Sequence, residues 1–283
     1  MTCLLGFVPL YLQKLKEIPS NRKIRLLFQP SEEGPSSGAA VLIKQGCLDG
    51  VDEVYGFHNW PIGNFGEILC RPGPVMSKVT TLKITIVGTG GHASTPEFSK
   101  VAIWKAVDFY SRLEEFNAEL KEKTGKLFIC TLPVFQAGER YNVISSTVTI
   151  EGTMRTFDQE IYEAIMGKIE SLLEEIRQDG FKCELEKMGY CMTANTEAEA
   201  GHVIRVAKEH LGEDKVSDKY LPFRASEDFG EYTLVKPGAF FFFCTKKEEG
   251  EPFLHDSRFN FKDELIETAS TFWLRLALDR LTQ

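Results

Sequence analysis

Two adjacent carboxylates and two distant histidines have the types and positions that metal chemistry requires. Glu32 and Glu33 follow the apolar run 23–28 and a proline, and His58 and His255 each follow a strand-like apolar run. Imidazole and carboxylate are the ligands of catalytic zinc. Of two adjacent carboxylates, one can hold a cation while the other moves protons. Taken singly, the acidic pair reads as a solvated turn and each histidine as structural; taken together, they predict a metal site.

The segment that must position the carboxylates is 23–28, KIRLLF. Apolar residues on both faces are expected of a strand buried in a parallel sheet. Pro30 ends the ladder because it has no N–H group and fixes φ. We therefore predict that 23–28 is the central strand of an α/β sheet. Glu32 and Glu33 would then lie in the crevice beyond its carboxyl end, where such sheets bind ligands.

The same domain needs further strands and covering helices. Strands are predicted over 52–58 and 238–244, and helices over 3–18, 36–47, 197–211 and 265–281. The chain opens in the first helix, whereas an α/β domain usually presents strands first. We therefore expect this fold to be incomplete at its N-terminal side.

Residues 78–190 predict a second unit. Its elements follow the order β-α-β-β-α-β of a ferredoxin-like fold, over 78–87, 100–121, 126–136, 146–155, 158–178 and 181–188. A stretch rich in glycine and proline precedes it, which places a boundary near Ser77. The predicted organisation is residues 1–76 as the first part of one domain, 77–190 as an inserted domain and 191–283 as the second part.

Composition excludes several functional classes. The 283 residues carry a net charge of −8, with a pI near 5.3 and no basic cluster, which argues against a nucleic-acid partner. No apolar run reaches the roughly 18 residues of a membrane span. The N-terminus lacks the basic region of a secretory signal. Seven cysteines without a CxxC pair indicate reduced thiols, and hence a cytoplasmic or organelle-matrix location.

Six segments together point to one enzyme family: FQPSEEG, GFHNWPIG, VGTGGHASTP, NVISSTVTIEGTMRTF, ASEDF and LHDSRFNF. Over essentially its whole length the chain resembles the dinuclear zinc amidohydrolases of the aminoacylase and carboxypeptidase superfamily. The branch it resembles is the hippurate hydrolase, N-acyl-amino-acid hydrolase and auxin-conjugate hydrolase group. The resemblance implies an α/β catalytic domain with a central, largely parallel sheet and flanking helices. It also implies an inserted ferredoxin-like α+β domain that dimerises or covers the site.

The resemblance implies hydrolysis of the amide bond of N-acyl amino acids or related small conjugates. In it Glu32 matches the general base that takes a proton from metal-bound water. Glu33 and His255 match ligands of one metal, and His58 matches a ligand of the other. The metals lower the pKa of the water and polarise the amide carbonyl. Two zinc ions are implied, although manganese and cobalt share these ligand types.

Three residues of the inserted domain also match family positions. His92 matches a histidine that reaches a partner subunit's active site and stabilises the oxyanion; the alternative is a histidine in a tight turn. Asn142 and Arg155 match a polar pair that holds the substrate carboxylate, for which the guanidinium fork is suited. Either could instead pair with a neighbouring acid. The implied partners are a small-molecule amide and a second copy of the chain, bound through 77–190. The remaining histidines, His202 and His210, are expected to be solvated.

One departure from the family pattern generates a second hypothesis. In this branch a Cys-Gly-His-Asp segment before the first helix supplies the ligand that bridges the metals, and Cys3 has no such neighbours. Since catalytic zinc normally keeps three protein ligands, we expect the chain as written to bind metal weakly and to hydrolyse little. The alternative to an amidohydrolase is an inactive paralogue that is retained as a structural, dimerising subunit.

Overall fold

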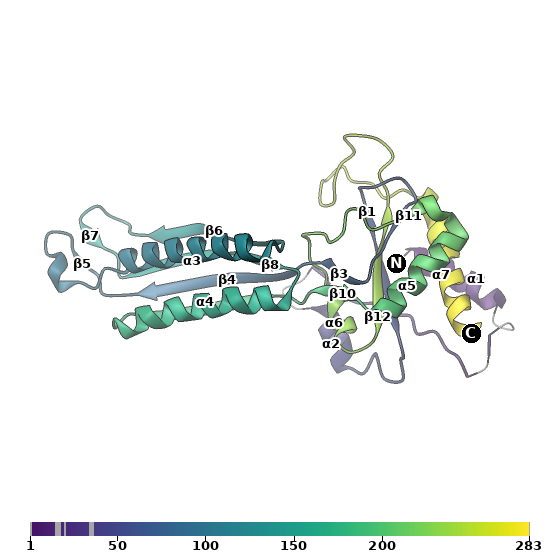
Figure 1. Cartoon of the computed structure of the whole chain (residues 1–283), viewed down its shortest axis with the longest axis horizontal. Coiled ribbons are helices and arrows are strands. Elements are labelled where there is room, and N and C mark those ends of the chain that lie inside the picture. Colours follow the sequence, from purple (N-terminus) through teal and green to yellow (C-terminus); the bar gives the residue numbers. More distant parts are fainter. Residues whose placement is uncertain (1, 15–17, 20, 34–36, 283) are drawn as a thin grey trace. The chain divides into compact units, whose positions relative to one another are not determined.

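The structure is a computed structural model that describes residues 2–14, 18–19, 21–33 and 37–282, the side chains of 2–5 excepted. The chain divides into two compact units (Figure 1). Unit 1 combines Met1–Met76 with Thr193–Gln283, and unit 2 is Ser77–Met192. The sequence placed these divisions after residues 76 and 190.

Unit 1 is built on a mixed sheet of four strands in the order β1-β12-β2-β11. β1 is parallel to β12, β12 is antiparallel to β2, and β2 is parallel to β11. The bounds are Val54–Trp60 for β1, Gly238–Cys244 for β12, Ile68–Leu69 for β2 and Val216–Ser217 for β11. Together with its flanking helices, this sheet confirms the predicted α/β fold.

Strand β12 carries the core of unit 1 on both of its faces. Because side chains alternate along a strand, Phe240 and Phe242 join one buried cluster, while Phe241 and Phe243 join another. The second cluster packs against α5 (Glu197–Leu211) and α7 (Glu264–Thr282). The first packs against α2 (Gly38–Lys44) and α6 (Gly230–Thr233), which lie on the other side of the β1–β12 pair (Figure 1).

Other elements complete unit 1. α1 (Thr2–Lys14) packs against α7, with Pro9 inside it. A Cβ at Gly6 would collide with the Ser270 hydroxyl, so a glycine permits this close helix contact. β3 (Gly73–Met76) pairs antiparallel with β10 (Thr193–Asn195). No described helix has the length and apolar character of a membrane span.

The predicted central strand at 23–28 is wrong, because no part of the described stretch 21–33 is a strand. A strand requires ladder partners, and β1 lies at the edge of the described sheet, paired only with β12. Side-chain hydrogen bonds hold the stretch instead. Arg25 Nη1 donates to the carbonyl oxygens of Cys47 and Asp49 at 2.7 and 2.9 Å. Phe28 remains 53% exposed, so the apolar run is not a buried one.

Unit 2 has the ferredoxin-like strand order β6-β8-β4-β9, fully antiparallel. Both helices cover one face of this sheet, since Leu82, Ile84 and Ile86 of β4 are buried with residues of α3 and α4, whereas Thr81 and Lys83 are exposed. A small β5–β7 pair lies at the far end of β4 and β8 (Figure 1). The elements are β4 (Lys78–Val87), β5 (Gly91–His92), α3 (Ala102–Thr124), β6 (Phe128–Ala137), β7 (Val143–Ile144), β8 (Thr147–Thr156), α4 (Gln159–Gln178) and β9 (Lys182–Tyr190).

His202 is buried, in contrast to the prediction that it is solvated, while His210 is exposed. The His202 ring lies between two elements that are distant in sequence. Its Nε2 is 2.9 Å from Asp279 Oδ2 on α7, and its Nδ1 is 3.1 Å from the Tyr55 hydroxyl on β1. Arg205 also pairs with Asp279. The partners that allow His202 to be buried are therefore Asp279 and Tyr55, which are distant from it in the sequence.

Asp279→Ala should lower the free energy of unfolding by about 1–3 kcal/mol, because it leaves the buried Nε2 of His202 without its acceptor. Urea denaturation measures the loss. Asp279→Asn is the matched variant, since its amide oxygen still accepts from Nε2, and it should lose less. Equal losses in the two variants would show that the His202 hydrogen bond contributes nothing.

Candidate metal and active site

The candidate site lies where β1 and β12 end. The two strands are parallel, so their carboxyl ends share one edge of the sheet. His58 belongs to β1, and His255 belongs to the loop that follows β12. The Phe253 ring of this loop lies 5.9 Å from the Trp60 ring at the end of β1. The pairing therefore brings together two histidines that are distant in the sequence.

Glu33 and His255 form the most direct contact of the predicted ligand set. His255 Nε2 lies 3.5 Å from Glu33 Oε1, and both side chains are largely exposed, at 74% and 72%. His58 is close enough that the charges of Glu33 and His255 both act on its pKa. Among the predicted metal ligands, Glu33 and His255 are thus in contact, and His58 lies within range of their charges.

The His58 ring is oriented by a contact with the backbone of the next residue. Its Nδ1 lies 2.6 Å from the Asn59 carbonyl oxygen, which makes Nδ1 the protonated nitrogen of a neutral ring and leaves the lone pair on Nε2. Metal-ligating histidines typically donate their other N–H in this way. Burial lowers the pKa of His58, which favours the neutral form.

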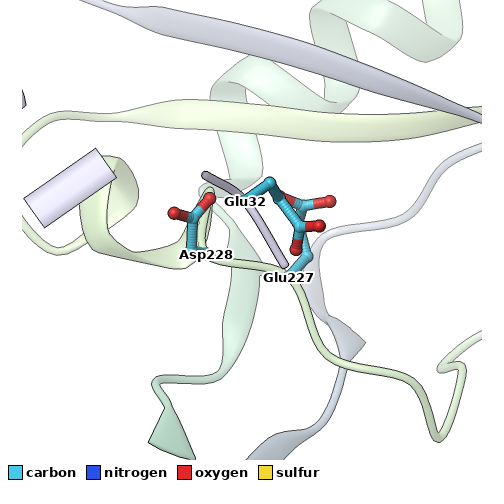
Figure 2. Close-up of side chains that lie close together, drawn as sticks. All are labelled: Glu32, Glu227 and Asp228. Carbon is cyan, nitrogen blue, oxygen red and sulfur yellow. The ribbon is translucent and has the colours of Figure 1, made fainter. Parts of the chain in front are cut away.

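Three carboxylates lie beside these ligands: Glu32, Glu227 and Asp228. One oxygen of each lies within 4.8 Å of the others (Figure 2). Glu32 comes from the turn that carries Glu33, whereas the other two precede α6 and are separated from it by Phe229. Glu227 and Asp228 are 8% and 0% exposed. Like charges at this spacing and burial repel strongly unless a proton or a cation lies near them.

The pKa values of the two glutamates reflect this crowding. Burial raises the pKa of Glu227 to about 8, and the charges of Glu32 and Asp228 add to the effect. Burial also raises the pKa of Glu32, and the negative charges of Asp228 and Glu33 raise it further. A carboxylate with a raised pKa is a better proton acceptor near neutral pH, as the role of a general base requires.

Two residues at the site have backbone angles that L-amino acids rarely adopt. Ser31, directly before Glu32, has φ 53°, and His255 has φ 67°. Such angles cost on the order of 1–3 kcal/mol and persist only where surrounding contacts impose them. The backbone on both sides of the Glu33–His255 contact is therefore held by other interactions.

The other three predicted site residues belong to unit 2. His92 and Asn142 lie together, because β5 pairs with β7 and Ala93 N donates to the Asn142 carbonyl oxygen at 3.1 Å. Both side chains are exposed, and His92 Nδ1 lies 2.7 Å from the Ser94 hydroxyl.

Arg155 lies near the opposite end of β8 from the β5–β7 pair. Arg155 lies eight positions after Thr147 along β8, which is about 26 Å at ~3.3 Å per residue. The structure therefore does not bring Asn142 and Arg155 together within one chain.

Glu227 and Asp228 were assigned no role from the sequence, although their motif, ASEDF, is one of the six segments that carry the family resemblance. A local signal was present, because two acids stand directly before Phe229 and a short apolar segment. Acidic residues are rarely buried without a polar or charged reason. What the sequence could not supply is their distance from Glu32, which arises from a contact across 195 or more positions.

Comparison with known proteins identifies relatives of this arrangement. The sequence pattern of peptidase family M20/M25/M40 matches residues 1–279. The chain is 29% identical over 265 residues to the hippurate hydrolase of Campylobacter jejuni, covering 92% of this chain and 68% of the relative. It is 34% identical over 252 residues to the N-acetyl-L-cysteine deacetylase of Bacillus subtilis, covering 88% of this chain and 59% of that protein.

A solved structure extends the comparison to three dimensions. The YXEP protein of Bacillus subtilis, described as a dinuclear metal-binding peptidase of the M20 family, matches with a TM-score of 0.80 and 26% identity. The match covers 99% of this chain and 70% of the neighbour. The chain thus spans about three fifths to seven tenths of the length of these relatives.

Glu227→Gln should stabilise the metal-free protein at pH 8.5 by about 1–4 kcal/mol and change little at pH 4.5. With a folded-state pKa of about 8 against an ordinary 4.5, Glu227 binds its proton more tightly in the folded state. The contribution of Glu227 to the stability of the wild type should therefore fall as the pH rises from 4.5 to 8, and the glutamine removes this loss. Denaturation at both pH values in the presence of a chelator measures the difference. An equal effect at the two pH values would contradict the raised pKa.

Proposed function

Because this chain belongs to peptidase family M20/M25/M40, whose members hydrolyse C–N bonds, we propose that it hydrolyses the amide bond of N-acyl amino acids or related small conjugates. The observation that carries the proposal is the approach of Glu33, His58 and His255 at one sheet edge, beside Glu32. The names of the relatives, a hippurate hydrolase and an N-acetylcysteine deacetylase, support the substrate class.

The donor set fits divalent metal, and we assign Glu33 and His255 to one ion and His58 to a second. The fit rests on three features. Glu33 and His255 are exposed and meet each other, His58 presents Nε2, and the neighbouring carboxylates supply negative charge. Carboxylate and imidazole ligands suit zinc and also manganese or cobalt. When bound, such ions lower the pKa of water and polarise the substrate carbonyl.

The protein's own part of the reaction is proton transfer. We assign Glu32 as the base that takes a proton from the attacking water and returns it to the leaving amine. Its raised pKa makes the carboxylate a stronger proton acceptor near neutral pH. Glu227 lies within 4.8 Å of it and contributes to its electrostatic environment.

Unit 2 is assigned to dimerisation. β6 and β9 are the edge strands of its sheet, and β6 with the adjacent α3 carries exposed apolar side chains. Trp104 and Val107 on α3 are 72% and 45% exposed, and Phe135 on β6 is 39% exposed. An apolar helix face beside an unpaired strand edge is suited to pairing with a second copy.

The same dimer gives roles to the remaining residues. We propose that His92 and Asn142 act in the site of a partner subunit, where the imidazole stabilises the oxyanion, and that Arg155 binds the substrate carboxylate. Their separation within one chain agrees with a site assembled from two subunits. The six described cysteines are free thiols, which supports a reducing compartment such as the cytoplasm.

Glu32→Gln and Glu33→Gln should fail in different ways, which tests the two assignments. In the native protein, Glu32→Gln should keep its metal and lose on the order of 100- to 10,000-fold in kcat, because an amide cannot accept the proton. Glu33→Gln should lose bound metal first and rate as a consequence. Elemental analysis together with the rate of hydrolysis of N-acetyl amino acids separates the two roles.

Two outcomes would overturn these assignments. Full activity in Glu32→Gln would exclude it as the base. A native protein that binds metal yet hydrolyses no N-acyl amino acid would favour the non-catalytic, dimerising subunit over the enzyme.

Trp104→Glu should convert the dimer to a monomer, because it places a charge in the centre of the proposed apolar contact. Sedimentation velocity at micromolar concentration measures the change. Glu163→Lys, an exposed charge reversal on α4, is the control and should remain dimeric. A wild-type monomer, or a dimeric Trp104→Glu, would exclude this surface.

A further inference from the structure

We propose that Asp228 is a positioning residue that fixes the Glu32–Glu33 turn by binding the chain on both sides of it. The inference rests on the proposed function, since it concerns how that site is held. Asp228 is fully buried beside Glu32, yet the hydrolytic chemistry above gives it no task. What it does follows from its partners.

Asp228 accepts hydrogen bonds from three residues of the segment 29–39. Gln29 Nε2 donates to both carboxylate oxygens, at 2.8 and 2.9 Å. The Ser37 hydroxyl donates to Oδ2 at 2.9 Å, and Ala39 N donates to Oδ2 at 3.0 Å. Hydrogen bonds to a charged acceptor are about twice as strong as neutral ones, and burial strengthens them further.

These partners bracket the turn in the sequence. Gln29 precedes Glu32 and Glu33, whereas Ser37 and Ala39 follow them. A single side chain therefore ties both flanks of the turn to one point in the core. The Gln29 amide is itself oriented, because the Tyr232 hydroxyl donates to its Oε1 at 2.7 Å. Nε2 is thereby directed toward Asp228.

The turn requires such an anchor because no ladder holds it. The described stretch 21–33 contains no strand, and Ser31 has φ 53°, an unfavourable angle for a serine. The position of Glu32 relative to Glu33 and His255 consequently depends on side-chain hydrogen bonds. A misplacement of about 1 Å at a catalytic group can cost on the order of 100-fold in rate.

A role for Asp228 as a direct metal ligand fits the contacts less well. Both of its oxygens already accept hydrogen bonds from donors of the 29–39 segment. A cation at Oδ2 would compete with the Ser37 hydroxyl and the Ala39 amide, both of which present positive charge to it. The geometry thus favours an anchor over a ligand.

Asp228→Asn in the native protein is the primary test. The side-chain NH2 group of the new asparagine would face the NH2 group of Gln29. Two donors cannot hydrogen-bond to each other, so the contact that holds the Gln29 side of the turn is lost. At saturating zinc, kcat for an N-acetyl amino acid should fall about 10- to 100-fold with KM little changed. Deuterium exchange of the amides in 29–41 should be about tenfold faster than in the wild type. Asp218→Asn, an exposed change of the same kind, should alter neither.

A second substitution reverses the first. Gln29→Glu added to Asp228→Asn restores complementarity, because the carboxylate introduced at position 29 accepts from the amide introduced at position 228 and still accepts from Tyr232. The double variant should recover kcat and slow exchange again, although each single variant is impaired. If Asp228→Asn does not fold, Gln29→Ala removes the same contact without altering Asp228 and should show the same loss of kcat and faster exchange.

The outcomes separate this inference from the proposed function. If Asp228→Asn or Gln29→Ala has the same kcat and the same amide exchange rates as the wild type, Asp228 does not anchor the turn. This conclusion holds whichever reaction the protein catalyses. Loss of kcat with unchanged exchange, or no recovery in the double variant, would also overturn it. If the wild type hydrolyses no N-acyl amino acid, the proposed function fails, while the exchange data still decide whether Asp228 holds the turn.

Discussion

The parallel pairing of β1 with β12 is the constraint on which the candidate site depends. Phe240 to Phe243 point alternately into two separate apolar clusters, so β12 is covered on both faces and cannot lie at the surface. Its register places Phe242 beside His58. Because both strands run in the same direction, the loop that carries His255 emerges at the edge where β1 ends. A shift of register would move His58 to the other face and separate the ligands.

The sequence predicted the elements that bury apolar residues with a regular period. β12, β4 and α5 were predicted with the bounds that the structure has, and the ferredoxin-like order of unit 2 follows from alternating strands and amphipathic helices. The same reasoning was wrong for 23–28, where an apolar run has no ladder partner among the described strands. A hydrophobic pattern in the sequence indicates that a segment prefers to be buried. A β-strand additionally requires an adjacent strand with which to form hydrogen bonds.

The site could be predicted from motifs but not from local chemistry alone. Glu33, His58 and His255 were predicted as one ligand set; the structure places Glu33 in contact with His255 and His58 within range of their charges. Asp228 and His202 were missed for one shared reason. Each is a polar side chain made acceptable in the core by partners far away in the sequence, Gln29 in one case and Asp279 in the other. Burial of a polar group is decided by such long-range pairing, which no short sequence window contains.

The antiparallel pairing of β3 with β10 has a consequence for the history of this architecture. Met76 lies opposite Thr193, so the chain leaves unit 1 and returns to it at neighbouring positions of one two-stranded ribbon. A short turn could join these positions, and everything between them is topologically the loop of a hairpin. Unit 2 is thus a cassette, that is, a complete domain inserted in the loop between β3 and β10. Loops of this kind tolerate the insertion of whole domains. Duplication, exchange or loss of the cassette would leave the strand order of unit 1 unchanged.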